Sequence, residues 1–472
     1  MKGERRKAKG EKVSGRAKLH SGLVFFTAVC LSGVMFLNAA AQQASSQMGM
    51  AFMSGTPGTF VIRGARIVTV SGADIENGSV VVRDGKIEAV GQTVRVPSGA
   101  QAIDGRGLTV YPGMIDLGTA MGLVEIPQGA NATVDTAEVG EMNPNARAIH
   151  GVNPHSAHVA VTRVNGVTSV LTLPQGGMIS GQAAFINLLG ATPAEMAVTP
   201  AAALVINFPR VALGGGGGFL AFLLQQQQQA PNVTEALQQR DRQVEQIRKM
   251  LRDAEAYGRA VDAAARDQSI PRPDVDVVLA PLVPYVRGEL PVVFRADREI
   301  DIRAAVRFAE EMKLKPIILG GTDAWKAASL LKEKNVPVIF NGTFDLPPNE
   351  DAPYDLNYES AAKLHQAGIR FSIATSDDAA HVRDLPYLAG MSAAFGLPRD
   401  AAIKAVTLYP AQIMGVADRM GSIEPGKVAN LVVTDGDLLE ARTNVRHLFI
   451  NGRQVPLTSR HTELYEQFRD RK

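Results

Sequence analysis

Short apolar runs alternate with amphipathic helical stretches through the middle of the chain, from about Gly113 to Ala417. The clearest part covers residues 291–340, where PVVF, PIILGG and VPVIF are separated by DIRAAVRFAEEMK and DAWKAASLLKEK. Fully apolar strands separated by amphipathic helices are typical of a parallel sheet covered on both sides. The pattern therefore predicts a barrel of β/α repeats or a doubly wound sheet, and the region could hold eight units.

Both ends of the chain flank this region with short β-type runs. Residues 60–115 contain alternating apolar segments, and Asn77-Gly78 and Asp84-Gly85 between them predict two hairpin turns. Residues 421–456 again alternate short Val, Leu and Ile runs with glycine-rich turns. Two β-rich ends predict one small β domain assembled from both ends of the chain.

One segment departs from the α/β pattern. Gly214 to Gly218 are five glycines, an apolar run follows, and Gln225 to Gln229 are five glutamines before a long helix predicted over 234–266. Low-complexity composition of this kind indicates a flexible segment. Two interpretations stay open: a surface insertion without chemistry, or a lid whose apolar centre covers the mouth of a barrel.

The first 41 residues have the layout of a secretory signal peptide. Residues 1–20 carry eight Lys or Arg and two Glu, and residues 21–41 are uncharged and end in Asn38-Ala39-Ala40-Ala41. This layout predicts cleavage after Ala41 and an exported protein, periplasmic or secreted. The alternative is an uncleaved membrane anchor, but a spanning helix needs about 20 apolar residues and the apolar run is somewhat shorter.

Composition narrows the class of partner. Removal of the leader changes the formal net charge from +2 to −4, which argues against nucleic acid. The only cysteine, Cys30, lies in the leader, so the mature chain can form neither a disulfide nor a thiolate metal site. No GxGxxG follows a predicted strand, so a dinucleotide-binding sheet has no support. The expected partner is a small-molecule substrate or ligand.

Two segments resemble a known family. The run from Tyr111 to Asp116, YPGMID, is similar to the first barrel strand of the amidohydrolase superfamily, which often reads PGxIDxHxH. The stretch AAIKAVTLYPAQIMGVADRMGSIEPGKVANLVVTDGDLL resembles the closing signature of that superfamily, where the chain leaves the barrel for the small β domain. The resemblance covers roughly residues 60–455 and is nearest to the imidazolonepropionase-like and prolidase-like exported branch.

The resemblance implies an α/β fold, a (β/α)8 TIM-type barrel with a small β-sandwich domain built from both chain ends. Barrels of this kind place their sites at the carboxyl ends of the strands. The expected boundaries are a signal peptide at 1–41, a linker at 42–57, a β-sandwich at 58–111 and 418–458, a barrel at 112–417 with an insertion at 212–232, and a tail at 459–472.

The resemblance also implies a divalent metal such as zinc, and this sequence departs from the ligand pattern. The family uses an HxH after the first strand, a carboxylated lysine or a carboxylate, a histidine after each of the fifth and sixth strands, and an aspartate after the eighth. Here Gly118 and Ala120 replace the HxH, and Arg295 and Gly320 replace the later histidines. Only the aspartate is kept, as Asp377 or its neighbour Asp378, with Asp377 the better aligned, so we expect no metal cofactor.

Other histidines do not rebuild that site. His155 and His158 have the spacing to share a helix face, but they follow a proline in a polar segment, and exposed side chains are the simpler interpretation. The segment after the eighth predicted strand is the better candidate, although a salt-bridged loop is an equal alternative for it. The predicted site residues are Asp377, Asp378, Arg295 and His381.

Two functions fit these residues. By resemblance, the protein is a hydrolase of carbon–nitrogen bonds other than peptide bonds, with Asp377 as general base and Arg295 on a carbonyl or carboxylate. Acid–base groups contribute about 10²–10⁴-fold in rate. Lowering the pKa of water by about nine units is worth roughly 12 kcal/mol, so a metal-free enzyme would be slow on amides. The alternative is a pseudoenzyme that binds a small anionic ligand or a partner protein.

Overall fold

The computed structural model describes residues 55–126, 131–211, 233–347, 351–376 and 378–471. The chain divides into two compact units, 1–53 and 54–472, and every described residue belongs to the second. The predicted signal peptide, nearly all of the predicted linker and the insertion at 212–232 lie outside the described residues. Within the described ranges, no helix combines the length and apolar character that a membrane crossing requires.

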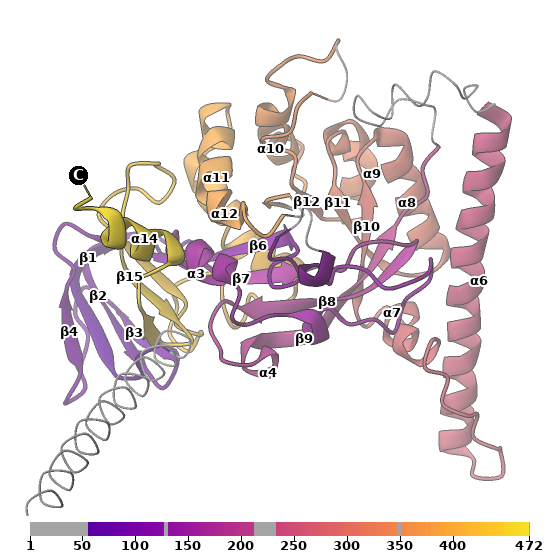
Figure 1. The fold of residues 1–472 in the computed structure, drawn as a ribbon, viewed down its shortest axis with the longest axis horizontal. Coiled ribbons are helices and arrows are strands. Elements are labelled where there is room, and N and C mark those ends of the chain that lie inside the picture. The colour runs from indigo at the N-terminus through magenta and orange to yellow at the C-terminus, as the bar shows by residue number, and fades with distance from the viewer. Residues whose placement is uncertain (1–54, 127–130, 212–232, 348–350, 377, 472) are drawn as a thin grey trace, which may run out of the picture. The chain divides into compact units, whose positions relative to one another are not determined.

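Strands from both chain ends form one hydrogen-bonded sheet, seen in indigo and yellow in Figure 1. Its order is β16-β15-β14-β5-β1-β2-β3, with β4 paired to β1. Strand β14 pairs with β5, and Leu431 lies opposite Pro112, so the predicted β domain of two chain ends is confirmed. The strands are β1 (Phe60–Ile67), β2 (Ile75–Arg83), β3 (Lys86–Gly91), β4 (Gln101–Asp104), β5 (Thr109–Pro112), β14 (Leu431–Thr434), β15 (Val445–Ile450) and β16 (Arg453–Val455).

The sheet curls around its own core. The rings of Phe60 on β1 and Phe449 on β15 pack with centroids 5.2 Å apart, although β5 and β14 lie between these strands in the sheet. Neighbouring strands are about 4.8 Å apart, so a flat sheet would separate the two strands by roughly 14 Å. The close ring contact therefore requires the two halves of the sheet to face each other, as in a sandwich.

One predicted hairpin turn is confirmed and one is wrong. Asp84-Gly85 forms a two-residue turn between β2 and β3, with φ of +51° and +80°, as a type I′ turn requires. Asn77-Gly78 instead lies inside β2, at an irregularity in the register with β1. Gly78 is needed there because a Cβ would lie 2.9 Å from a methyl of Ile75. The dipeptide supports a bulge and not a turn.

The central region forms a second sheet of eight strands, in the order β6 to β13. Seven of these strands run parallel and β8 runs antiparallel to both neighbours. Only six residues, 173–178, connect β7 to β8, whereas a parallel crossover needs a dozen or more. The strands are β6 (Met114–Thr119), β7 (Val167–Thr172), β8 (Ile179–Asn187), β9 (Ala197–Asn207), β10 (Pro291–Ala296), β11 (Lys315–Gly320), β12 (Val338–Phe340) and β13 (Phe371–Ile373).

Helices cover the outside of these strands (Figure 1). Phe294 on β10 packs against Phe308 on α8, with ring centroids 6.3 Å apart. The helix predicted over 234–266 is present as α6. The α-helices are α2 (Ala148–Gly151), α3 (Ala157–Arg163), α4 (Pro193–Met196), α6 (Val233–Arg266), α7 (Val283–Val286), α8 (Glu299–Glu311), α9 (Ala328–Glu333), α10 (Leu356–Gln366), α11 (Leu385–Ala394), α12 (Arg399–Ala405), α13 (Leu408–Ile413) and α14 (Arg460–Phe468). Short 3₁₀ turns are η1 (Asn131–Thr133), η2 (Ala280–Leu282), η3 (Ala324–Ala327) and η4 (Val382–Asp384).

Alternate residues of the barrel strands fill the barrel interior. On β6 these are Ile115 and Leu117, and on β11 they are Ile317 and Leu319. A spacing of two is expected because successive side chains of a strand point to opposite faces. The same periodicity locates the residues that reach the ends of the barrel.

A buried carboxylate joins the first and last strands of the barrel. Asp116 on β6 is fully buried and accepts hydrogen bonds from Thr375 Oγ1 at 2.5 Å, Thr375 N at 3.3 Å and Gly118 N at 2.8 Å. Thr375 is the second residue after the end of β13. Asp116 therefore fixes the end of β13 against β6, and with it the start of the segment in which Asp377 and Asp378 were predicted.

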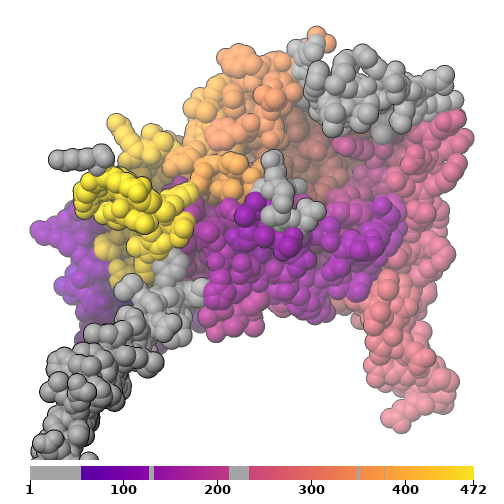
Figure 2. Space-filling model, in the orientation of Figure 1, coloured from indigo at the N-terminus to yellow at the C-terminus, as the bar shows by residue number. Residues whose placement is uncertain are grey.

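The predicted tail contains a helix, α14, which follows a capping box between Ser459 and Thr462. None of the side chains of α14 is buried, and in Figure 2 this helix lies on the surface in yellow. Leu464, Tyr465 and Phe468 are among its exposed residues. The helix therefore contributes little to the core.

Candidate functional site

The carboxyl ends of the parallel strands, together with the amino end of β8, form the mouth of the barrel. Val205 on β9 and Val293 on β10 point into the barrel interior. Asn207 and Arg295 stand two residues farther along the same strands, so their side chains point to the same side, at the mouth of the barrel. Both residues line a cavity of about 690 Å³, which we call the mouth cavity.

The mouth cavity lies between strand ends and the first turns of α6. Glu235 and Arg240 line it from α6. Asn207 Nδ2 donates to Gly177 O at 2.6 Å and to Ser180 Oγ at 3.1 Å. These partly buried hydrogen bonds connect the end of β9 to the start of β8 and so hold one wall of the cavity in place.

Asp297 lines the same cavity two residues after Arg295. Its pKa is raised above the ordinary 3.8, first because the surrounding protein desolvates the carboxylate and second because the negative charge of Asp345 is nearby. Thr322 opposes this effect in part, with Oγ1 3.5 Å from Asp297 Oδ1. The side chain keeps exposed surface and can meet a ligand. A carboxyl with a raised pKa in a cleft is a candidate acid or base.

The mouth cavity presents both signs of charge. Arg298 donates to Asp301 at 2.7 Å and to Val211 O at 3.2 Å, so the charge of Arg298 is largely balanced within the rim. A molecule in this cavity could place a carbonyl or an anionic group at Arg295 and exchange a proton with Asp297. The charged residues that line it are Arg210, Arg240, Arg295, Arg298, Glu141, Glu235, Asp297 and Asp301.

Two of the expected metal-ligand positions have no room for a side chain. A Cβ on Gly118 would lie 2.8 Å from Thr375 O and 2.9 Å from Ala374 Cβ, because the end of β13 packs against this position. A Cβ on Gly320 would clash with Asp297 Oδ1, and the backbone there has a φ of +103°. The carboxylate of Asp297 occupies the space that a histidine at position 320 would require.

The residues at the expected ligand positions do not fit the metal that the resemblance implies. Gly118, Ala120 and Gly320 offer no donor side chain, and Arg295 is permanently cationic. Within the ranges that the structure covers, no group of three or more His, Cys, Asp or Glu is placed to hold a metal ion. Asp377 lies outside the described residues. We therefore assign no reaction step to a metal.

Asp378 and His381 lie together in a surface turn. Asp378 Oδ2 is 2.8 Å from His381 Nδ1, and Asp378 Oδ1 accepts from Ala380 N at 2.8 Å. The His381 side chain is 57% exposed, and neither residue lines the mouth cavity. The three predicted site residues that the structure describes thus divide: Arg295 lies with Asp297 in the cavity, and Asp378 pairs with His381 in the loop.

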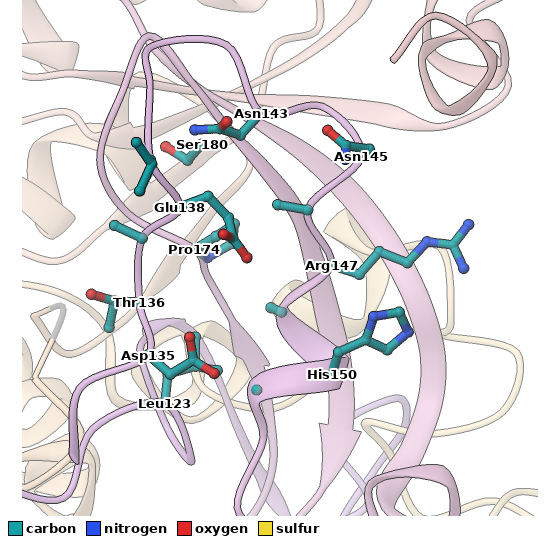
Figure 3. A pocket seen from close by; sticks show the side chains of 15 residues that line it. Leu123, Asp135, Thr136, Glu138, Asn143, Asn145, Arg147, His150, Pro174 and Ser180 are labelled. Carbon is teal, nitrogen blue, oxygen red and sulfur yellow. The ribbon is translucent and has the colours of Figure 1, made fainter. Parts of the chain in front are cut away.

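A second cavity, of about 400 Å³, is lined by Leu123, by residues between Asp135 and Gly151, and by Pro174 and Ser180. Figure 3 shows the carboxylates of Asp135 and Glu138 on one side of it and the ring of His150 on the other. Of the histidines weighed as ligands, His158 instead has Nε2 2.9 Å from Glu125 O. We favour the mouth cavity as the functional site because it holds the interior Arg295 and an acid with a raised pKa.

Sequence reasoning missed Asp297 and Asp345. Both residues follow barrel strands, β10 and β12, and both have a pKa raised by burial. For Asp297 a signal was present: in PVVFRADRE the acid stands two residues after Arg295, so both can face the mouth. Asp345 stands five residues after its strand, and no periodicity could have located it.

Comparisons with other proteins agree on one family. The amidohydrolase family model matches residues 306–455. Amidohydrolase tasK of Hapsidospora irregularis is 25% identical over 402 residues, which are 80% of this chain and 39% of the relative. The imidazolonepropionase of Mesorhizobium japonicum is 28% identical over 150 residues, 31% of this chain and 35% of the relative. The chain thus spans about two fifths or less of these relatives.

Solved structures extend the likeness to the whole fold. An amidohydrolase from Thermotoga maritima MSB8 superposes with a TM-score of 0.73 at 26% identity, over 84% of this chain and 99% of that chain. A prolidase solved with n-methylphosphonate-L-proline has a TM-score of 0.50 at 18% identity, over 84% and 99% of the two chains. The second likeness supports the fold alone. The predicted barrel with its companion β domain is confirmed by these matches.

Proposed function

Because the chain belongs to the amidohydrolase superfamily, we propose that it hydrolyses a carbon–nitrogen bond, other than an ordinary peptide bond, in a small molecule held in the mouth cavity. One observation carries the proposal. Arg295 and Asp297 line the same cavity at the carboxyl end of β10, and the pKa of Asp297 is raised. A fixed cation that can stabilise a developing oxyanion and an acid that can exchange a proton, in one cavity, together suit acyl transfer from nitrogen to water.

The reaction uses these two side chains in turn. The Asp297 carboxylate takes a proton from water while the water oxygen bonds to the carbonyl carbon, and the electron pair of the carbonyl moves to its oxygen. Arg295 donates hydrogen bonds to that oxygen as its charge develops. When the carbon–nitrogen bond breaks, the leaving nitrogen takes the proton from Asp297. The products are a carboxyl compound and an amine.

The rate argument restricts the substrate. General acid–base catalysis supplies about 10²–10⁴-fold, and loss of one oxyanion-stabilising donor typically costs about 10²–10³-fold. These factors together are too small for an unactivated amide. We expect a substrate whose nitrogen leaves readily, such as a cyclic ureide, an imide or an activated anilide.

The test is an activity screen on purified protein that begins at Gln42, with the metal content measured on the same sample. Asp297→Asn should lower kcat at least 100-fold, and Arg295→Ala should lower kcat/KM by a similar factor. Asp378→Asn, outside the cavity, should stay within threefold of wild type and serves as the matched control. About one or two zinc ions per chain by plasma mass spectrometry, or full activity in Asp297→Asn, would contradict this mechanism.

A second function is favoured by the two closed ligand positions. Gly118 and Gly320 have no room for metal-binding side chains. A pseudoenzyme that binds an anionic ligand through Arg295 has no need of such side chains. Calorimetry with small carboxylates then separates the two functions. Binding that Arg295→Ala abolishes and Arg295→Lys partly restores, without turnover of any compound in the screen, supports the pseudoenzyme.

We also propose that the protein works outside the cytoplasm. The support is the basic and apolar layout of residues 1–41 and its small residues before Gln42. Amino-terminal sequencing of the exported protein should begin at Gln42. An amino terminus at residue 1 in a membrane fraction would instead support the uncleaved anchor.

A further inference from the structure

A mainly apolar hollow lies against the middle of α6. It has a volume of about 390 Å³, and Met142, Met178, Met250 and Leu279 supply its apolar lining. Met178 is buried and the other three pack partly buried against the core. Lys249 and Asp253 line it too, but they pair with each other at 2.6 Å. We call this hollow the methionine trough.

The methionine trough adjoins the mouth cavity. Glu141 and Met178 line both. Along α6, the mouth cavity is lined by residues up to Gln243 and the trough by residues from Gln246 onward. Steps of three and four residues keep side chains on one helix face, so a single face of α6 runs past both hollows.

The two hollows differ in chemistry. The mouth cavity carries Arg295 and Asp297, which suit a carbonyl or a carboxylate, whereas the trough offers thioether and aliphatic surface. Methionine is flexible and polarisable and adapts to apolar groups of different shape. A molecule that fills both hollows must be polar at one end and apolar at the other.

We propose that the substrate is amphipathic: its reacting polar end lies at Arg295 and Asp297, and an apolar acyl or alkyl substituent lies in the methionine trough. This inference rests on the proposed function of the mouth cavity and adds the substrate class. The trough is a specificity subsite, because it touches the part of the substrate that does not react. Each buried methylene is worth about 0.8 kcal/mol, which corresponds to about fourfold in affinity.

The test uses a series of 3-acylamino-6-nitrobenzoic acids with acyl chains from acetyl to decanoyl. Each compound carries a carboxylate, an activated anilide bond and a tail of chosen length, and release of the coloured amine reports hydrolysis. With wild-type protein, the Kd from calorimetry should fall about fourfold per methylene until the trough is filled. Met250→Gln should flatten this dependence and leave the acetyl compound unchanged, whereas Met391→Gln, on α11, should behave as wild type.

A second measurement does not depend on turnover or on a variant. Mild peroxide oxidises accessible methionines to sulfoxides, and mass spectrometry follows each one. The decanoyl compound should slow the oxidation of Met142 and Met250 but leave Met391 unchanged, and the acetyl compound should protect none of them.

The outcomes separate the two proposals. Binding with no dependence on chain length, an unchanged slope in Met250→Gln, or no protection of Met142 and Met250 overturns the methionine trough and leaves the mouth cavity standing. Chain-length-dependent binding without release of the amine supports the trough and overturns hydrolysis. Failure of every compound to bind overturns the inference.

Discussion

At the scale of single residues, Gly320 illustrates how one position closes an expected ligand site. Its backbone has a φ of +103°, and a Cβ there would clash with Asp297 Oδ1. Gly320→Ala should lower the free energy of unfolding by about 2–5 kcal/mol, because backbone strain and overpacking add. Gly415→Ala is the matched control: its φ is +67° and nothing lies within 4 Å of the added Cβ, so about 1–2 kcal/mol is expected. Urea unfolding of both variants checks this, and equal losses would contradict the clash.

The raised pKa of Asp297 predicts a pH dependence of stability. Between the ordinary 3.8 and its higher folded value, Asp297 binds its proton more tightly in the folded state than in the unfolded state. The contribution of Asp297 to stability is therefore fully present below pH 3.8 and is lost as pH rises through the folded pKa. Asp297→Asn removes this loss. The free energy of unfolding of the variant, minus that of wild type, should therefore increase from pH 4 to pH 7. A difference that stays constant with pH in urea unfolding would show that the pKa is not raised.

At the scale of elements, the contact between β6 and β13 depends on Asp116. Asp116→Asn replaces a carboxylate oxygen that accepts from Thr375 by an amide that cannot accept, and the expected loss is about 1.5–3 kcal/mol. Hydrogen exchange should become faster at Thr375 and along β13. The amides of β10, which has ladders on both sides, form the internal control. Equal acceleration in β10 would mean global destabilisation and not a local opening.

Several elements were predictable because their signals are local. The helix α6 and the Asp84-Gly85 turn follow from periodicity and turn chemistry. The direction of β8 could also have been inferred, since residues 173–178 are too few for a crossover. The bulge at Gly78 could not, because it depends on how Ile75 packs beside β1.

The candidate site was predictable only in part. The resemblance of the barrel strands to the family pattern was enough to place Arg295 at the end of β10 and to show that histidines are missing at the expected ligand positions. Both features are visible directly in the sequence. The altered pKa of Asp297 was not readable, since it depends on burial and on Asp345, 48 positions away in the chain. The pairing of Asp378 with His381 depends on how the loop turns after β13. Tertiary contacts decide these features.

At the scale of the whole molecule, the β domain requires both chain ends. A chain that stops after Gly421 loses β14 to β16, exposes the edge of β5 and removes the fully buried Leu431 and Phe449. We expect no cooperative thermal unfolding for this chain. A chain that stops after Ser459 loses only α14, which has no buried side chain, and should unfold within about 1 kcal/mol of wild type. Similar behaviour of the two truncations in calorimetry would contradict this division.

The antiparallel direction of β8 provides an attachment site far from the mouth of the barrel. Because β8 enters the barrel at the mouth, the connection that joins it to β9, which includes α4, lies at the opposite end of the barrel. Ala194 in α4 is exposed, and Cys30 is the sole thiol of the chain and lies in the predicted leader. An Ala194→Cys chain without the leader would therefore accept one dye or surface linker, with the opening of the barrel left clear for single-molecule observation of ligands.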